Sequence, residues 1–333
     1  MTRPGTTHSM KPGGFAASCL LMTSAAFVVA GVGAHGQGTR APAPDPVAAI
    51  LAAHRAADAN YSNALLSPFT AVAVQYFQPG QTIRLAVGPS GPVFGPAASG
   101  AVAVDLTLEA GAFAVASASG ASPRVVNATR DGGVSGLPGT PVAGRPRLAA
   151  REILAVGRYF VEFVTAPGNG NARVFDPESP ARRAFTGLKW FPPNLALQVK
   201  ARFAASAAPT PITITTSRGL EREYFRVGTF EFAAEGRALR LTALATIAAP
   251  KPGDELFVAF RDATTGRETY EVGRYLFIPF SGAHASYILD FNLATNPLCN
   301  YSPHYNCPIP LRENTLPVAI RAGEMSYPAH HLE

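Results

Sequence analysis

The residues best suited to chemistry gather in one stretch of the chain, from Glu255 to Glu324. Eight of the 22 acidic residues lie in or directly before this stretch, and five arginines are interleaved with them. The acidic residues are Asp254, Glu255, Asp262, Glu268, Glu271, Asp290, Glu313 and Glu324, and the arginines are Arg261, Arg267, Arg274, Arg312 and Arg321. Carboxylates among guanidinium groups form either paired structural networks or sites for acid–base chemistry.

Two interpretations of this polar cluster are open. In the first, its side chains clamp irregular backbone, because a long loop needs hydrogen-bond partners for its N–H and C=O groups. In the second, a carboxylate among Asp262, Glu268 and Asp290 is a general acid/base, and Arg274 orients an anion. We favour the first interpretation. Glu268 and Arg274 would share a face of one predicted strand, since alternate residues of a strand point to the same side.

If the cluster is a binding pocket, its side chains come from a predicted hairpin, a strand that ends in DFN and the loop that follows. The candidate ligand-binding residues are Asp262, Glu268, Tyr270, Arg274, Asp290, Asn292, Asn296, Glu313 and Asn314. No catalytic residue is assigned, because the sequence contains no GxSxG, HExxH or Walker motif.

The two cysteines outside the leader, Cys299 and Cys307, are eight positions apart. In an exported protein such a pair predicts a disulfide. The alternative is a metal site made by Cys299, His304 and Cys307, with His284 as a possible fourth ligand. The spacing is not that of a standard zinc site. We therefore predict the disulfide and no metal or other cofactor.

Charge and composition exclude some partners. The chain has 333 residues and a formal net charge of +6, which falls to about +4 without the leader. The basic residues are scattered rather than grouped in a block that could follow phosphates, so we predict no nucleic-acid partner. The sequence has no GxGxxG motif and no alternation of strands with helices, so it does not indicate a nucleotide-binding fold.

The first 36 residues have the pattern of a signal peptide. Arg3 and Lys11 precede an apolar run from Phe15 to Val32, and small residues follow, with cleavage expected between Ala34 and Gln37. Residues 37–44 read as a Pro/Ala linker. No later stretch is apolar enough to span a membrane. We expect an exported protein, periplasmic or secreted.

After the linker, the pattern predicts one amphipathic helix over residues 45–60 and then short strands between Gly/Pro/Ser turns. His54 is expected to pack on the helix, and Trp190 to plug the junction of two halves. Residues 129–147 are expected to be a mobile loop. The expected strands are 82–87, 101–108, 112–118, 124–127, 158–164, 171–175, 197–203, 212–216, 223–232, 238–247, 255–260, 267–279, 286–291 and 316–321.

Together these segments predict an all-β fold, mainly antiparallel, with two packed sandwich-like or barrel-like modules preceded by one N-terminal α-helix. The predicted boundaries place the helix and a small β module at 45–183. A second β module, which carries the polar cluster and the cysteine loop, is expected at 184–328.

Three segments carry a resemblance to a known family: RVFDPESPARRAFTGLKWFPP, FRDATTGRETYEVGRYL and LDFNLATNPLCNYSPHYNCPIPLRENTLPVAIRAGE. This chain resembles the bacterial family known as domain of unknown function 1684, strongly in its C-terminal half. The resemblance implies an exported, mostly β protein and no particular activity.

We therefore predict a non-enzymatic module of the cell envelope, with a polar pocket in its C-terminal β module. That pocket would bind a small polar ligand, a glycan or an envelope protein. The alternative is a periplasmic hydrolase with a carboxylate general acid/base and an anion-orienting arginine. A catalytic carboxylate should lie in an open, concave pocket and have a perturbed pKa, which separates the two hypotheses.

Overall fold

The computed structural model describes residues 45–327, except residues 97, 121–122, 167 and 284. The predicted signal peptide and linker therefore lie outside the described residues. Within the described part of the chain, no helix is both long and apolar enough to cross a membrane.

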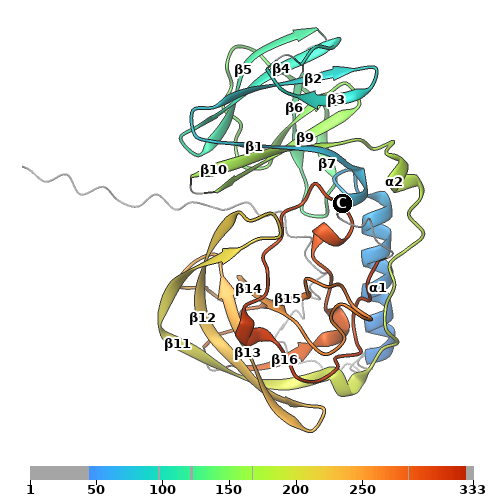
Figure 1. Cartoon of the computed structure of the whole chain (residues 1–333), viewed down its shortest axis with the longest axis vertical. Coiled ribbons are helices and arrows are strands. Elements are labelled where there is room, and N and C mark those ends of the chain that lie inside the picture. Colours follow the sequence, from blue (N-terminus) through green and yellow to red (C-terminus); the bar gives the residue numbers. More distant parts are fainter. Residues whose placement is uncertain (1–44, 97, 121–122, 167, 284, 328–333) are drawn as a thin grey trace, which may run out of the picture.

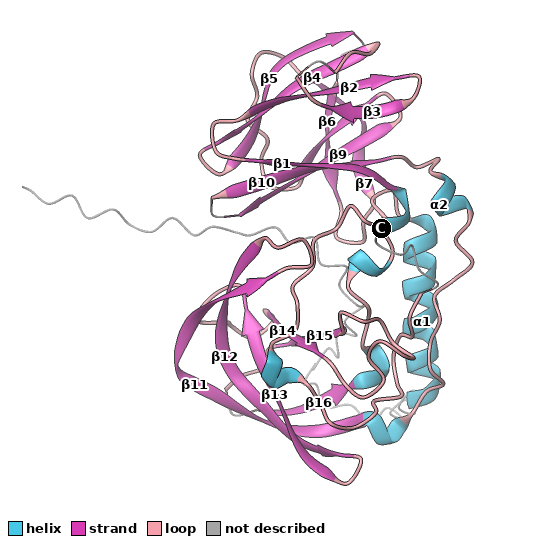
Figure 2. Ribbon diagram, viewed as in Figure 1, coloured by secondary structure: helices cyan, strands magenta, loops and turns pink. Residues whose placement is uncertain are grey.

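The chain is mainly antiparallel β structure with one long helix at its start, which confirms the predicted fold class. Its strands form two groups, one above the other in Figure 1, with β1 to β10 in the upper group and β11 to β16 in the lower. Helix α1 (Pro46–Asn63) runs along the side of the lower group (Figures 1 and 2).

The upper group, here called the N-terminal β module, contains two sheets with the strand orders β1-β10-β9-β8-β6-β7 and β3-β2-β4-β5. Apolar side chains from both sheets fill the space between them, so the module is a sandwich. Its strands are β1 (Ala71–Phe77), β2 (Thr82–Gly88), β3 (Gly91–Phe94), β4 (Val102–Glu109), β5 (Ala112–Gly120), β6 (Arg124–Ala128), β7 (Val134–Pro141), β8 (Glu152–Val156), β9 (Tyr159–Ala166) and β10 (Asn169–Phe175).

The lower group, the C-terminal β module, is one sheet of order β15-β14-β13-β12-β11-β16. The long strands β11 and β12 curve strongly in Figure 2, so the sheet wraps around its own core like a partial barrel. The final segment adds Leu316 and Ile320 to that core. The strands are β11 (Gln198–Thr215), β12 (Glu221–Ala234), β13 (Arg237–Ala245), β14 (Glu255–Phe260), β15 (Arg274–Pro279) and β16 (Ser286–Asp290).

Short helical turns connect these elements. They are η1 (Pro68–Thr70), α2 (Pro180–Arg183), η2 (Leu195–Leu197), η3 (Phe291–Leu293), η4 (Leu298–Asn300) and η5 (Arg312–Asn314). The turn after β12 is tight: Ala234 pairs with Arg237, and Glu235 and Gly236 both have positive φ, at 49° and 71°. Two such residues make the hairpin turn that suits the twist of antiparallel strands.

Helix α1 begins at a regular cap, in which Asp45 accepts a hydrogen bond from the amide of Val47. His54 is buried, as expected, and its Nε2 lies 2.8 Å from the carbonyl oxygen of Asn292. The ring of His54 stacks on that of Trp190 with centroids 3.9 Å apart. The helix therefore packs against the C-terminal half of the chain, although it precedes the N-terminal β module in sequence.

The chain enters and leaves the N-terminal β module at one place. β1 and β10 are paired neighbours, with Ala71 opposite Phe175. Directly before and after them, the amide of Asp176 donates to the carbonyl oxygen of Thr70 at 2.7 Å. The two connections to the rest of the molecule therefore lie side by side.

The segment predicted as a mobile loop, 129–147, instead contains strand β7. Val134 and Thr140 pair with residues of β6, and a register shift interrupts the ladder between them. Gly136 and Gly139 have positive φ there, which glycine adopts without a steric cost. Strands β1, β3 and β8 were also not predicted.

Two predicted strands of the polar cluster are wrong in extent. The strand expected over 267–279 begins only at Arg274, because the amides of Arg267, Glu268 and Thr269 all bond to the carbonyl oxygen of Thr264 in a tight turn. Residues 316–321 form no strand, and the amide and carbonyl oxygen of Ile320 bond to the side chains of Asp262 and Arg274 instead. Glu268 and Arg274 therefore do not share a strand face.

Candidate functional site

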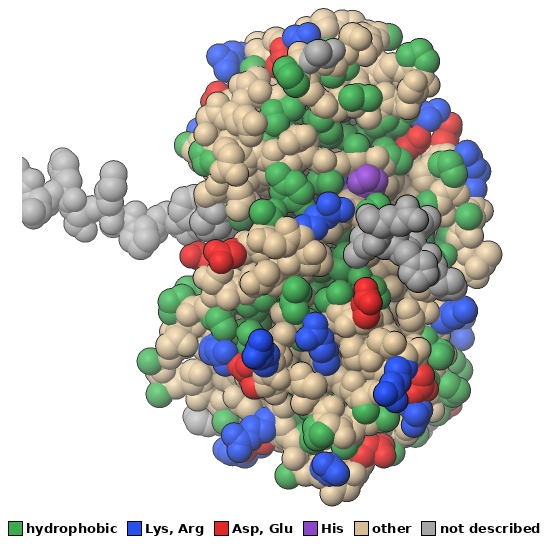
Figure 3. All heavy atoms as spheres, viewed as in Figure 1, with side chains coloured by type: hydrophobic (Ala, Val, Ile, Leu, Met, Phe, Trp, Pro, Cys, Tyr) green, Lys and Arg blue, Asp and Glu red, His purple; other side chains and the backbone are tan. Residues whose placement is uncertain are grey.

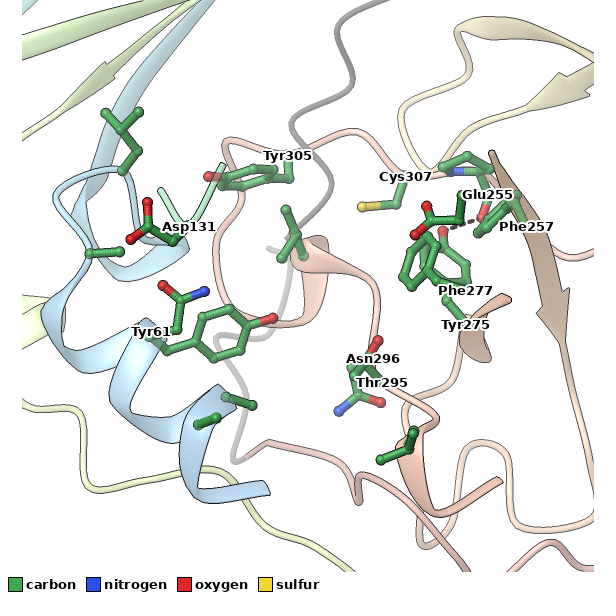
Figure 4. A pocket seen from close by; sticks show the side chains of 18 of the residues that line it. Tyr61, Asp131, Glu255, Phe257, Tyr275, Phe277, Thr295, Asn296, Tyr305 and Cys307 are labelled. Atoms are coloured by element: carbon green, nitrogen blue, oxygen red, sulfur yellow. Dashed lines mark hydrogen bonds between the residues drawn. The ribbon is translucent and has the colours of Figure 1, made fainter. Parts of the chain in front are cut away.

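A cavity of about 840 Å³ lies between α1, the N-terminal β module and the C-terminal β module. Its walls come from α1, from β9, β10 and the β6–β7 loop, from strands β12 to β15, and from residues 293–308. Figure 4 shows α1 on one side of this space and the strands of the C-terminal β module on the other. In Figure 3, apolar side chains gather at the waist between the two modules, while Lys and Arg are scattered among Asp and Glu.

Aromatic rings from the C-terminal sheet form one wall of the cavity. Phe257 and Phe277 are directly opposite each other on β14 and β15. The ring of Phe257 lies 5.6 Å from those of Tyr224 and Phe277 and 4.8 Å from that of Tyr275, between centroids. On the α1 side, alanines line much of the cavity together with the larger side chains of His54, Asn60, Tyr61 and Asn63, and these alanines are Ala53, Ala56, Ala57, Ala59 and Ala64. Because these alanine side chains are short, they do not fill the space between the helix and the aromatic rings.

One ion pair lines the cavity on the side of the N-terminal β module. Arg173 Nη1 donates to Glu162 Oε2 at 2.9 Å, and the two side chains are 7% and 8% exposed. The guanidinium also lies over the ring of Tyr305, 4.0 Å from its centroid. The charge of Arg173 is thus compensated within the protein.

Glu255 and Asn296 line the cavity with side-chain oxygens that have no donor among the described residues. Among the described residues, the carboxyl group of Glu255 has no hydrogen bond or ion pair, and burial raises its pKa to about 7. Asn296 is buried and donates from Nδ2 to the carbonyl oxygen of Met325 at 2.8 Å. Its Oδ1 has no partner within the described residues. A ligand with hydrogen-bond donors would satisfy both groups.

The structure places most of the predicted pocket residues elsewhere. Of the nine candidates, Asn296 alone lines the cavity. Asp262 and Arg274 form a buried ion pair outside the cavity, with Arg274 Nη2 2.8 Å from Asp262 Oδ2. The side chain of Arg274 is 1% exposed and that of Asp262 is 0% exposed. Arg274 also donates to the carbonyl oxygens of Ile320 and Ala322, and Asp262 accepts from the amide of Ile320 at 2.9 Å. These are the contacts of a clamp on the final segment.

Other candidates hold local structure or lie at the surface. Glu268 pairs with Arg321 and Glu313 with Arg226, both at exposed positions. Such pairs contribute little to stability.

Asp290 and Asn292 form a third group. Asp290 accepts from Gln198 Nε2 at 2.7 Å and from the amide of Asn292 at 3.0 Å. Asn292 exchanges two hydrogen bonds with the backbone of Asn194. None of these three groups opens onto the cavity.

The predicted disulfide is not formed in this structure, where Cys299 and Cys307 are both free, buried thiols. The amide of Cys299 donates to Sγ of Cys307 at 3.3 Å, and the hydroxyl of Tyr270 donates to Sγ of Cys299 at 3.6 Å. Each sulfur therefore accepts a hydrogen bond where the disulfide was expected. The hydrogen bond to the Cys307 thiol lowers the pKa of Cys299 to about 7, and burial raises the pKa of Cys307.

For the alternative metal site, no group of three or more His, Cys, Asp or Glu in the described chain is arranged to hold an ion. His284 lies outside the described residues.

A second buried carboxyl group, Glu324, organises the end of the described chain. It is 0% exposed, accepts from the amide of Asn296 at 2.9 Å and accepts from the hydroxyl of Tyr301. Burial raises its pKa to about 7. Folding therefore favours the protonated form of Glu324 over the carboxylate.

This shift predicts a pH dependence of stability. Because the folded-state pKa lies above the ordinary value of 4.5, the contribution of Glu324 is full below about pH 4.5 and is lost as pH rises to about 7. The loss amounts to about 3 kcal/mol. Glu324→Gln removes it, so urea unfolding of the wild type should lose stability relative to this variant between about pH 5 and about pH 8. The exposed Glu223→Gln serves as the control, and parallel profiles of wild type and Glu324→Gln would contradict the expectation.

Sequence patterns did not point to the cavity, because its lining comes from distant and individually ordinary residues. Alanines of α1 and alternate aromatic residues of β14 and β15 are typical of any packed core. One signal was present: Glu255 is a charged residue in a strand whose other five residues are all apolar. In the structure, this charged residue at the start of the apolar strand lines the cavity.

The fold and the cavity define a mainly antiparallel β protein with an internal space of ligand size. Residues 183–325 match the model of a family described as "Protein of unknown function (DUF1684)", which confirms the resemblance in the C-terminal half. No curated protein matches the chain. Among solved structures, an uncharacterized protein of Haloarcula marismortui is 35% identical, with 45% of this chain and 82% of that chain covered and a TM-score of 0.38.

Proposed function

We propose that this protein is an exported, non-enzymatic binding protein whose ligand occupies the cavity between the two β modules. The observation that carries the proposal is the cavity itself. Its volume of about 840 Å³ falls in the range of small-molecule sites, and its lining is mostly apolar with a few polar groups. Such a lining suits a small molecule with an apolar body and a polar end. The leader pattern of the first 36 residues supports export.

The carboxylates that the hydrolase hypothesis named as general acid/base do not lie in the cavity. Asp262, Glu268 and Asp290 all lie outside the cavity and are bound to arginines, amides or side-chain amides of the protein itself. A general acid/base needs access to the proton that it transfers. The placement of these three carboxylates therefore removes the catalytic groups that the hydrolase hypothesis named, and leaves Glu255 as a carboxyl group with a raised pKa that lines the cavity.

Filling the cavity should weaken binding of a small apolar ligand without unfolding the protein. Ala57 lines the cavity from α1, and Ala57→Phe places a ring in the space. We expect the affinity for a neutral apolar fluorophore, N-phenyl-1-naphthylamine, to fall about tenfold or more, because the ring occupies volume that the probe needs. Fluorescence titration measures this, using protein recovered from the periplasm or medium with its N-terminus between Ala34 and Gln37.

The matched control is Ala48→Phe, which adds the same ring to an exposed position of the same helix. This control should bind the fluorophore like the wild type, and both variants should keep the wild-type melting temperature. Equal binding by wild type and Ala57→Phe would overturn the proposal, as would a protein found only in the cytoplasm with its leader intact.

A further inference from the structure

We infer that the cavity binds an organic cation, an ammonium group on an apolar body, held by Glu255 and the aromatic rings beside it. This inference rests on the proposed function, because it names the chemical class of the ligand in the same cavity. The recognising chemistry is an anionic oxygen beside the faces of several rings, the combination that selects ammonium ions.

The alternation of β14 and β15 brings these groups together. Leu256 and Val258 point into the core of the C-terminal β module, so Glu255 and Phe257 project from the opposite face into the cavity. On β15, Leu276 and Ile278 lie in the same core. The residues that alternate with them, Tyr275 and Phe277, therefore also project toward the cavity, where Phe277 lies opposite Phe257 and Tyr275 lies opposite Ala259. Figure 4 shows Glu255 on the same side of the cavity as Phe257, Tyr275 and Phe277.

The rings are held in place before any ligand binds. The hydroxyl of Tyr275 donates to the carbonyl oxygen of Pro308 at 2.5 Å, which fixes that ring against the segment behind it. Phe257 packs edge-on to Tyr275, with centroids 4.8 Å apart and planes at 78°. Preorganised faces of this kind bind a cation with little loss of side-chain freedom.

The charge balance of the lining favours a cation. Four carboxyl groups, of Asp131, Glu162, Asp254 and Glu255, and two guanidinium groups, of Arg173 and Arg222, line the cavity among the described residues. The whole chain has the opposite excess, with 28 Lys and Arg against 22 Asp and Glu. An acidic cavity in a basic protein attracts cations by its local potential.

The unsatisfied acceptors agree with the charge balance. Glu255 and Asn296 Oδ1 offer lone pairs to the cavity and lack donors among the described residues. A carboxyl group that stays partly protonated at neutral pH because of burial, as Glu255 does, ionises fully when a cation lies against it. An anionic ligand would instead add a like charge beside this carboxyl group.

The test compares two molecules of the same shape. Phenethylammonium and propylbenzene differ only in an ammonium group in place of a methyl group, and each competes with N-phenyl-1-naphthylamine in a fluorescence displacement titration. We expect wild-type protein to bind the cation about tenfold more tightly than its neutral analogue. Glu255→Gln keeps the shape of the side chain and removes its charge. This variant should reduce the preference to within about twofold.

The matched control is Glu223→Gln. Glu223 is exposed and lies on the face of β12 that points away from the cavity, so this variant should keep the wild-type preference for the cation over its neutral analogue. Equal binding of cation and neutral analogue by the wild type would overturn the inference, as would tighter binding of phenylacetate. A preference that survives in Glu255→Gln would also overturn it. These outcomes are distinct from failure of the proposed function, in which the fluorophore would not bind the cavity at all.

Discussion

Arg274→Met is expected to destabilise the protein by about 3–5 kcal/mol, the cost of breaking a buried ion pair by removing one partner. The substitution leaves the carboxylate of Asp262 buried without its cation. It also frees the carbonyl oxygens of Ile320 and Ala322, which Arg274 binds. Unfolding in urea, followed by circular dichroism, measures the loss.

The control is Arg321→Met, which breaks the surface pair with Glu268 and should cost less than about 1 kcal/mol. A second measurement separates the clamp from a binding site. Folded Arg274→Met should still bind N-phenyl-1-naphthylamine as tightly as the wild type, because Arg274 does not line the cavity. Equal stability of the two variants would contradict the clamp, and a selective loss of binding in Arg274→Met would return Arg274 to the site.

Asn314→Ala should cost about 3 kcal/mol, because it removes hydrogen bonds that join two neighbouring strands. The register of β13 with β14 contains a single pair, Leu244 and Phe257. Beyond that pair, the side chain of Asn314 bridges the strands. It accepts from the amide of Thr242 at 2.7 Å and donates to the carbonyl oxygens of Thr242 and Ala259 at 3.0 and 2.9 Å.

The truncation leaves these backbone groups buried and unpaired, so the loss exceeds that of an ordinary polar side chain. Thermal and urea unfolding measure it. Asn127→Ala, at an exposed position of β6, is the control and should change the free energy of unfolding by less than about 0.5 kcal/mol. A similar small effect of Asn314→Ala would show that the gap between β13 and β14 closes without this side chain.

The sequence predicted regular elements where one face or both faces of a strand are apolar. Strand β14 has the bounds that its apolar run predicts, 255–260. Strand β7 was not predicted because glycine and proline dominate it, and pairing with β6 outweighs their low strand propensity.

Within the polar cluster, the residue types indicated a clamp on loop backbone, and the buried contacts of Asp262 and Arg274 with Ile320 have that form. The cavity could not be predicted in the same way. It depends on where the alanines of α1 come to lie relative to Phe257 and Tyr275, which are about 200 positions away in sequence. Packing between modules, rather than any local pattern, creates that space.

The side-by-side connections at Thr70 and Asp176 have a consequence for how the chain divides. Helix α1 and the C-terminal β module form one discontinuous unit, and residues 71–175 are an insertion whose ends are already hydrogen-bonded neighbours. Replacing an insertion of this kind by a short linker closes only a small loop, at a small entropic cost. The region that matches the family model, 183–325, therefore packs against a helix that lies more than a hundred residues earlier in the chain. In that helix, His54 contacts the carbonyl oxygen of Asn292.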